Sequence, residues 1–177
     1  MGSGTTLVEA KLLNRNAIGV DINPQSVSIS ETNLQFQCET KSKIHTRCAN
    51  ATDLSFIKDS HIDFICTHPP YANIIKYSKN VDGDISLLTV EEFLKEMTVV
   101  AQEAYRVLRK GKACAVMIGD MRRYGKVVPL GFWVMECFLS VGFVSKEIII
   151  KEQHNCRSTD YWEKQNNNFL LLAHEYI

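Results

Sequence analysis

The sequence predicts an α/β protein in which a doubly wound, mostly parallel sheet carries helices on both faces. Helical patterns, with apolar residues three or four positions apart, alternate with short apolar runs along the chain. This alternation is typical of sheets whose strands are connected by helices. Residues 143–150 and 169–176 are apolar runs without a helical pattern between them, so they predict a closing antiparallel pair with a long tip. The length of 177 residues suggests one domain, residues 1–177.

Signals at helix ends support the individual elements. Asn23 and Pro24 suit the N-cap and first position of one helix, and Thr89 with Glu92 forms a capping box that begins another. Gly111 is expected to end that second helix. The predicted helices cover residues 7–13, 24–36, 89–110 and 129–142. The predicted strands cover residues 17–22, 44–49, 62–67, 113–118, 144–150 and 169–173. Polar or basic loops are expected at residues 72–88, 121–126 and 151–168.

The composition sets limits on location and partners. The 20 Lys and Arg residues balance 20 Asp and Glu residues, which argues against a large nucleic-acid surface without excluding local basic loops. The six cysteines show neither a CxxC pair nor zinc spacing. We therefore expect buried free thiols, no metal site and a reducing, cytoplasmic setting. No apolar run approaches about 18 residues, so no membrane-spanning segment is expected.

A glycine-rich loop followed by a distal acid predicts a nucleoside cofactor site. Gly2, Ser3 and Gly4 precede a helix, where small residues let a ligand approach backbone N–H groups. Asp21 ends the next predicted strand, roughly where a carboxylate accepts both hydroxyls of a ribose. Asp53 follows the strand at residues 44–49 and has two interpretations of about equal weight, an adenine contact or the cap of a short turn.

A stiff turn after the strand at residues 62–67 is the main candidate for catalysis. It contains Thr67, His68, Pro69, Pro70 and Tyr71. Each proline lacks an N–H and restricts the residue before it, so backbone carbonyls face outward at the carboxyl end of a strand. Open α/β sheets bind ligands at that edge. Acceptors beside a flat aromatic ring suit a planar base that bears an exocyclic amine.

Residues 1–6 and 67–71 resemble the cofactor loop and the Pro-Pro-Tyr catalytic motif of amino-directed DNA methyltransferases, which use S-adenosylmethionine. Residues 119–122 and 174–176 also resemble features of this family, so the resemblance covers nearly the whole chain. It implies a Rossmann-like class I methyltransferase sheet with an antiparallel last strand. It further implies an enzyme of DNA methylation, of the restriction–modification kind, that modifies adenine N6 or cytosine N4.

The resemblance also implies roles for single residues. The Pro69 carbonyl and the His68 side chain would accept the two N–H groups of the base amine, Pro70 would stiffen the turn, and Tyr71 would stack on the base. The base must leave the helical stack, so flipped or single-stranded DNA is the implied partner. The implied cofactor contacts are Gly2, Ser3, Gly4, Thr5, Thr6, Asp21, Ile22, Asp53 and Thr67. The implied substrate contacts are Lys76, Tyr77, Arg122 and Arg123. Asp120 fits a helix or turn cap better than a substrate contact.

Two departures from the family pattern leave alternatives open. His68 stands where the family has Asp, Asn or Ser. Because a protonated imidazole has no acceptor, we expect activity to fall as His68 gains a proton; otherwise His68 only shapes the turn. The chain also begins inside the cofactor loop, so we expect an N-terminal segment, or a partner subunit, to supply the preceding strand. The alternative functions are methylation of an RNA base or of a protein glutamine, and a non-catalytic partner subunit.

Overall fold

A computed structural model describes residues 1–78, 81–152 and 174–177. The helices are α1 (Thr5–Leu12), α2 (Pro24–Asn33), α3 (Val90–Val107) and α4 (Leu130–Val141), with two short 3-10 helices, η1 (Ala72–Ile74) and η2 (Ile85–Leu87). The strands are β1 (Ala17–Asp21), β2 (Ile44–Cys48), β3 (Ile62–Thr67), β4 (Leu108–Val116), β5 (Met121–Arg123), β6 (Lys126–Val128), β7 (Ile150–Glu152) and β8 (His174–Tyr176). Helices and strands alternate through most of the chain, which confirms the predicted α/β architecture.

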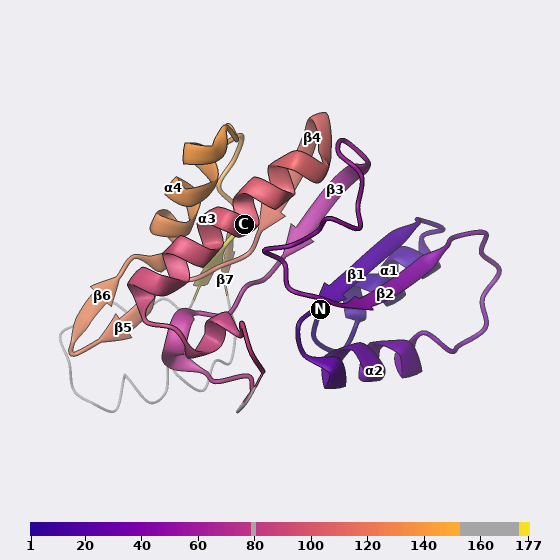
Figure 1. Cartoon of the computed structure of the whole chain (residues 1–177), viewed down its shortest axis with the longest axis horizontal. Helices are drawn as coiled ribbons and strands as arrows, with labels where there is room; N and C mark the ends of the chain where they lie inside the picture. The colour runs from indigo at the N-terminus through magenta and orange to yellow at the C-terminus, as the bar shows by residue number, and fades with distance from the viewer. Residues whose placement is uncertain (79–80, 153–173) are drawn as a thin grey trace.

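The sheet consists of separate strand pairs. β1 pairs with β2 and β3 pairs with β4, both in parallel, whereas the β5–β6 and β7–β8 pairs are antiparallel. Within the described residues, β1 and β3 each bond to a single neighbouring strand, and Figure 1 shows the two parallel pairs as separate units. The predicted parallel pairing is therefore confirmed. It forms two pairs rather than one continuous sheet because no described strand bridges β1 and β3.

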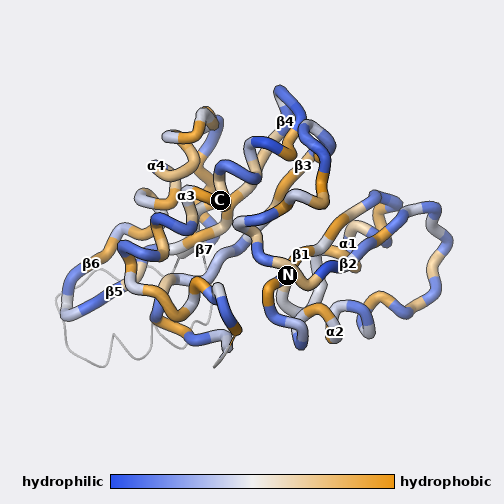
Figure 2. The backbone as a smooth tube through the Cα atoms, viewed as in Figure 1, coloured by the Kyte–Doolittle hydropathy of each residue, from blue (hydrophilic) through white to orange (hydrophobic). Residues whose placement is uncertain are grey.

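The ends of β1 and β3 place the predicted site. Both strands run in the same direction in Figure 1, and the N terminus lies beside the end of β1. Figure 2 shows hydrophobic residues along both strands. Asp21 ends β1 and Thr67 ends β3. The predicted cofactor acid and the predicted catalytic turn therefore lie at the same edge of the two strand pairs.

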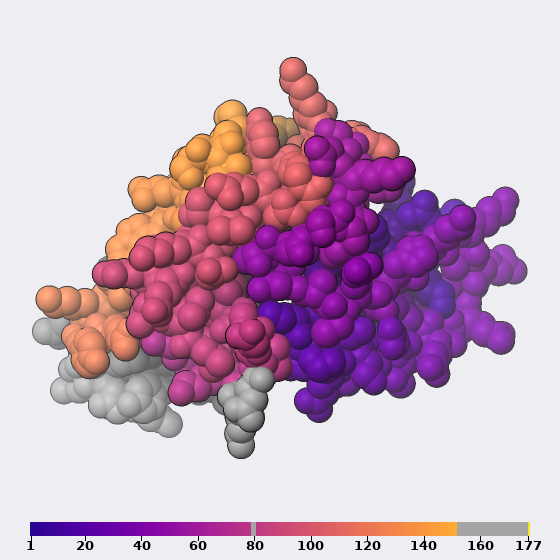
Figure 3. Space-filling model, in the orientation of Figure 1, coloured from indigo at the N-terminus to yellow at the C-terminus, as the bar shows by residue number. Residues whose placement is uncertain are grey.

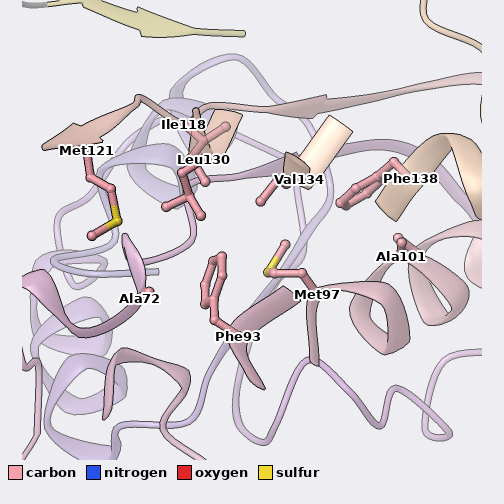
Figure 4. Packing of buried hydrophobic residues seen from close by; sticks show 10 residues of the cluster. Ala72, Phe93, Met97, Ala101, Ile118, Met121, Leu130, Val134 and Phe138 are labelled. Atoms are coloured by element: carbon pink, nitrogen blue, oxygen red, sulfur yellow. The ribbon is translucent and has the colours of Figure 1, made fainter. Parts of the chain in front are cut away.

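The main hydrophobic core lies between α3 and α4. Phe93 and Met97 of α3, together with Leu130 and Val134 of α4, are at most 1% exposed. Figure 4 shows these side chains pointing toward one another. Burying each such side chain contributes about 1.5–3 kcal/mol. Ala72 belongs to the same cluster, so this core also anchors the segment that follows the Pro-Pro turn.

The ends of two helices differ from the prediction. The capping box at the start of α3 is confirmed. The helix ends at Val107, whose carbonyl accepts the His61 N–H at 2.8 Å, and β4 begins at once because Leu108 pairs with Ile62. Gly111 consequently lies inside β4 instead of ending the helix. The second helix, α2, is also a few residues shorter than predicted.

Two predicted loops contain regular structure. Residues 72–88 include η1 and η2. Residues 121–126 form most of the β5–β6 hairpin, in which Tyr124 and Gly125 have φ angles of 51° and 72°. Positive φ at both central residues is typical of a type I′ turn, which favours Asn-Gly. The Tyr-Gly pair does not carry that signal, which explains why the sequence indicated a loop.

The last strands pair as predicted but differ in extent. β7 and β8 are antiparallel, with Lys151 opposite Glu175. The predicted strand at residues 144–150 is wrong for most of its length, because regular pairing starts only at Ile149, whose N–H bonds to the Ile177 carbonyl at 2.9 Å. The described part of the chain offers residues 144–148 no partner strand. The predicted strand at residues 169–173 lies outside the described residues.

Two further expectations concern membranes and cysteines. Across the described residues, the helices lack the length and apolar character needed to cross a membrane. The five cysteines in this part of the chain are free thiols, as predicted, but Cys48 and Cys66 are exposed rather than buried. Burial raises the pKa of Cys114 to about 12.

Candidate active site

The glycine-rich loop and Asp21 lie together at the end of β1. The Oδ2 atom of Asp21 accepts hydrogen bonds from the Met1 amino group at 2.8 Å and from the Gly2 N–H at 3.3 Å. The Oδ1 atom accepts the Asn23 N–H at 2.9 Å. The carboxylate thus ties the loop before α1 to the turn before α2. This is the juxtaposition that the sequence predicts for a cofactor loop and its distal acid.

Backbone geometry explains two glycines of the loop. Gly2 and Gly4 have φ angles of 58° and 82°, a region that favours glycine. A Cβ atom on Gly4 would lie 2.8 Å from the Cβ of Ser30, so α2 can approach this closely only at a glycine. A Cβ atom on Gly2 would meet no atom within 4 Å. Gly4 is therefore required for the close packing of the loop against α2, whereas Gly2 borders open space.

Two side chains of α2, which sequence reasoning missed, support the same loop. Ser30 is fully buried, and its Oγ atom donates to the Gly2 carbonyl at 3.2 Å. Asn33 donates through Nδ2 to the Ser3 carbonyl at 2.9 Å. Residues three positions apart share a helix face. That spacing, on the helix that follows Asp21, is the signal that the sequence offers for this support.

The remaining predicted cofactor residues occupy the surroundings of this loop. Thr5 and Thr6 are exposed in the first turn of α1, and Ile22 directly follows Asp21. Thr67 ends β3, where its carbonyl accepts the Met117 N–H at 2.9 Å. The structure thus brings Ile22 close to the acid, while Thr67 lies at the neighbouring strand end.

Asp53 caps a tight turn after β2. Its Oδ1 atom accepts the Ser55 N–H at 3.0 Å. Hydrogen bonds from the backbone and side chain of Ser55 lower the pKa of Asp53. The cap, one of the two interpretations of this residue, is therefore present, and the exposed carboxylate keeps acceptor capacity for a ligand.

A clamp from α3 fixes the residue after Asp53. Glu103 accepts the Leu54 N–H at 2.7 Å, and Arg106 donates to the Leu54 carbonyl at 2.9 Å. Arg106 also donates to Glu103 at 2.8 Å, and these hydrogen bonds lower the pKa of Glu103. No local pattern in the sequence indicates this clamp, because its members are about 50 residues apart along the chain.

The Pro-Pro turn brings His68 and Tyr71 together. The Nε2 atom of His68 lies 3.2 Å from the Tyr71 hydroxyl, and the two rings meet edge to face with centroids 5.7 Å apart. Pro69 is buried and Pro70 half-buried, whereas the His68 side chain is exposed. The turn therefore has a rigid, buried base and a polar pair at its surface.

Ala72 holds the turn against the core. It has a φ angle of 45° and is fully buried. Positive φ costs a residue with a Cβ atom about 1–2 kcal/mol, a cost that burial in the α3–α4 core offsets here. This backbone conformation redirects the chain immediately after Tyr71.

The loop after η1 is held by a buried acid that sequence reasoning missed. Asp84, which is 8% exposed, accepts the Ser78 hydroxyl at 2.5 Å and the Ser86 N–H at 2.8 Å. Ser86 is fully buried and accepts the Tyr77 N–H at 3.0 Å. Burial raises the pKa of Asp84, but the hydrogen bonds from Ser78 and Ser86 outweigh it and lower the pKa overall. We call these four residues the Asp84 latch.

An open cavity of about 810 Å³ lies between the latched loop and the start of α2. In the space-filling view, the magenta surface of this loop meets the indigo surface of the N-terminal half (Figure 3). The lining residues are Asn23, Gln25, Lys76, Tyr77, Ser78, Val81 and Leu87. Two predicted substrate residues, Lys76 and Tyr77, thus lie close to the turn that Asp21 holds.

The other predicted substrate residues lie on the β5–β6 hairpin. Arg122 is opposite Val127, and Arg123 is opposite Lys126 at the end of the ladder. Asp120, just before the hairpin, accepts the Gly131 N–H at 3.1 Å. This hydrogen bond at the start of α4 confirms the prediction that Asp120 is a cap.

Comparisons with solved structures confirm the class I methyltransferase fold. A SAM-dependent methyltransferase from Methanosarcina mazei matches with a TM-score of 0.61 and 17% identity over 99% of this chain and 85% of its own. A protein described as a candidate DNA modification methylase from Thermus thermophilus, complexed with S-adenosyl-L-methionine, matches with a TM-score of 0.53 and 24% identity. That match covers 73% of this chain and 51% of the Thermus chain, so the present chain spans about half the length of that relative.

The sequence also matches one family. No curated protein matched the chain by sequence. The family described as the RMKL-like methyltransferase domain matches residues 1–122, which contain the glycine loop, Asp21 and the Pro-Pro turn. The match confirms the methyltransferase part of the resemblance seen in the sequence. Since it covers well over half of the 177 residues, the chain belongs to the RMKL-like methyltransferase domain family.

Proposed function

We propose that the chain is an S-adenosylmethionine-dependent methyltransferase that modifies the exocyclic amine of a DNA base, adenine N6 or cytosine N4. The proposal rests on two groups at one edge of the fold: the Asp21–Gly2 cluster at the end of β1 and the turn of residues 67–71 at the end of β3. In open α/β sheets, ligands bind at the carboxyl ends of the strands. A methyl donor at the first group would face an amine at the second.

The residues of the first group fit this cofactor. Asp21 offers a carboxylate to two ribose hydroxyls, and the open space at Gly2 lets a ligand approach the loop backbone closely. When bound, S-adenosylmethionine supplies a methyl group on a positively charged sulfur. The further proposed contacts are Ser3, Gly4, Thr5, Thr6, Ile22, Asp53 and Thr67.

The acceptors of the turn prepare the amine to react. The nitrogen lone pair of a base amine is delocalised into the ring, which makes the amine a weak nucleophile. The Pro69 carbonyl accepts one N–H and a neutral His68 imidazole accepts the other, so the lone pair is directed out of the ring plane. With the cofactor bound, the nitrogen would form the new N–C bond as the S–C bond breaks, and one N–H proton would pass to His68 or to water. Positioning the reacting atoms about 3–3.5 Å apart supplies most of the rate gain.

Several features favour a nucleic-acid base as the substrate. Tyr71 presents an aromatic ring beside the acceptors, and a base that has left its stack can pack on such a ring. Lys76, Tyr77, Arg122 and Arg123 are the proposed contacts to the rest of the strand. The description of the Thermus relative as a candidate DNA modification methylase supports DNA in particular.

Methyl transfer from labelled cofactor tests the proposal. The protein is incubated with S-adenosylmethionine carrying a labelled methyl group and, separately, with DNA, RNA and protein, and the products are digested and identified by mass spectrometry. We expect N6-methyladenine or N4-methylcytosine from DNA. The Asp21→Ala variant should lose cofactor binding by calorimetry, while His68→Ala should keep binding and lose transfer. Labelled methyl groups in RNA or on protein glutamine would identify those molecules as the substrate instead of DNA. Absence of cofactor binding would indicate a non-catalytic subunit.

A further inference from the structure

The β5–β6 hairpin carries an unusually exposed aromatic residue. Tyr124, at the tip, is 90% exposed. The guanidinium carbon of Arg123 lies 5.6 Å from the centre of the Tyr124 ring, and Lys126 begins the returning strand. Figure 1 shows the hairpin projecting from the body of the molecule. Within the described residues, neither Arg123 nor Lys126 forms an ion pair. Among the described residues, the tip therefore presents to solvent an aromatic ring and two cations without an ion-pair partner.

The requirements of the turn do not account for this tyrosine. Tyr124 has a φ angle of 51°, and a residue with a Cβ atom pays about 1–2 kcal/mol for that conformation. Type I′ turns favour Asn, Asp or Gly at this position. The tyrosine side chain also gains no burial that would offset the strain. Apart from the contact with Arg123, the described residues leave this ring open to solvent.

The base of the hairpin is fixed next to the Pro-Pro turn. Met121, the first residue of β5, is 4% exposed and belongs to the same hydrophobic cluster as Ala72 and Phe93. Figure 4 shows Met121 and Ala72 in this cluster. Ala72 directly follows Tyr71 of the turn. Tyr124 at the tip is three positions after Met121, a reach of roughly 10 Å in extended chain. The tip therefore lies within reach of the hydrophobic cluster that anchors the segment after the Pro-Pro turn.

We propose that this hairpin binds unpaired nucleotides next to the base that is methylated, with Tyr124 stacking on a neighbouring base and Arg123 and Lys126 contacting phosphates. The inference rests on the proposed nucleic-acid substrate and names a second point of contact for it. Stacking on an aromatic ring tolerates every base, because each base has a π-face. Lysine and arginine next to the ring neutralise the backbone that such a base carries. The hairpin therefore fits a single-stranded or locally opened strand rather than an intact duplex.

Equilibrium binding to oligonucleotides tests the proposal. Fluorescence anisotropy is measured with a labelled single-stranded 12-mer and its duplex, at several salt concentrations, for the wild type and three variants. Tyr124→Ala should weaken single-strand binding about 5- to 150-fold, while Tyr124→Phe, which keeps the ring, should bind like the wild type. The double variant Arg123→Ala/Lys126→Ala should reduce the slope of log K against log salt by about 1.4.

Matched controls separate a local effect from unfolding. Lys58 and Lys110 are exposed and lie near the amino ends of β3 and β4, at the edge opposite the proposed site. The Lys58→Ala/Lys110→Ala variant removes the same charge and should leave binding unchanged. A wild type that binds oligonucleotide, with Tyr124→Ala and Arg123→Ala/Lys126→Ala equal to it, overturns the hairpin proposal alone. A wild type that binds neither strand overturns it together with the nucleic-acid substrate.

Discussion

The imidazole of His68 and the phenol of Tyr71 meet across two prolines, with Nε2 of His68 3.2 Å from Oη of Tyr71. A neutral imidazole has one donor and one acceptor nitrogen. When Nε2 donates to the tyrosine oxygen, Nδ1 keeps the lone pair that the proposed mechanism needs. When Nε2 accepts from the hydroxyl, no acceptor remains for the amine. Tyr71 therefore influences which tautomer His68 adopts, and it also provides an aromatic ring.

The Tyr71→Phe variant tests this hydroxyl. It keeps the ring and removes the hydroxyl that, by accepting from Nε2, would hold His68 in the tautomer that the proposed mechanism needs. Because a neutral hydrogen bond contributes about 0.5–1.5 kcal/mol, we expect kcat to fall roughly 2- to 10-fold with little change in KM. Tyr71→Ala should raise KM as well, since it also removes the stacking surface. Equal kcat for Tyr71→Phe and the wild type would exclude a role for the hydroxyl.

The pH dependence of methyl transfer tests His68 itself. The protonated imidazole ring has no acceptor. We expect kcat/KM to fall when the pH is lowered far enough to protonate His68. His68→Asn keeps an amide oxygen that does not titrate, so its profile should be flat at a reduced maximum. A flat wild-type profile would indicate that His68 only shapes the turn and that the Pro69 carbonyl is the working acceptor.

Two glycine variants separate packing from ligand binding. Gly4→Ala places a methyl group 2.8 Å from the Cβ of Ser30 at a φ of 82°, so we expect it to lower the free energy of unfolding by about 1–3 kcal/mol. Gly2→Ala has a similar φ but open space around it, and should cost only about 1 kcal/mol. Thermal melts measure this difference. Calorimetry should show that Gly2→Ala weakens cofactor binding more than its stability loss explains, and equal melting of both variants would contradict the packing argument.

Asp84 makes the loop sensitive to acid. Its pKa lies below the ordinary value of 3.8, because hydrogen bonds from Ser78 and Ser86 outweigh burial. A depressed folded-state pKa means that the contribution of Asp84 to stability is complete above about pH 3.8 and is lost as the pH falls through the lower folded value. Asp84→Asn should cost about 1–3 kcal/mol near neutral pH and should remove this part of the acid dependence. Unfolding curves at pH 7 and pH 3 measure both effects. If the wild type and Asp84→Asn lose the same free energy of unfolding between pH 7 and pH 3, the proposed role of the Asp84 latch is contradicted.

Local signals in the sequence explain the elements that were predicted correctly. The Asn23 side chain accepts the Gln25 N–H at 2.9 Å as an N-cap should, and the Thr89–Glu92 capping box forms at the start of α3. The turn of residues 67–71 follows its strand as two successive prolines require. In these cases the information lies within a few residues, and so the sequence alone was sufficient.

The features that were missed depend on residues far apart in the chain. Ser30 supports Gly2 from 28 positions further along the chain. Glu103 accepts the Leu54 N–H from 49 positions away, and no local pattern indicates that contact. The early end of α3 has the same origin, since β4 begins where Ile62 pairs with Leu108. The type I′ hairpin was missed for a different reason, because Tyr124 is an unusual residue for its backbone conformation.

The open edges of β1 and β3 lead to a further prediction about hydrogen exchange. The Ala17 N–H bonds to the Lys43 carbonyl, on the side of β1 that faces β2. Because the backbone groups of successive residues alternate between the two sides of a strand, those of Ile18 and Val20 point away from β2. By the same argument, the Thr67 carbonyl bonds to Met117 beside β4, and Phe64 and Cys66 present their backbone to the open side of β3. Within the described residues, no strand pairs with these open sides. We therefore expect the amides on the open sides to exchange faster than those of Gly19 and Ile65.

A strand added upstream of Met1 should remove this difference in amide exchange rate. A strand parallel to β1 and β3, placed between them, would end beside Asp21, where the Met1 amino group lies, and α1 would then connect it to β1 as one β–α–β unit. We propose that a chain extended upstream of Met1 by such an apolar strand protects Ile18, Val20, Phe64 and Cys66 from exchange. Because the added strand would pair backbone groups at the open edges of β1 and β3, the extended chain should also melt at a higher temperature and bind S-adenosylmethionine more tightly. Unchanged exchange at all four amides in the extended chain would reject this placement. Slowing at Gly19 and Ile65 by the same factor as at the four amides would indicate global stabilisation alone.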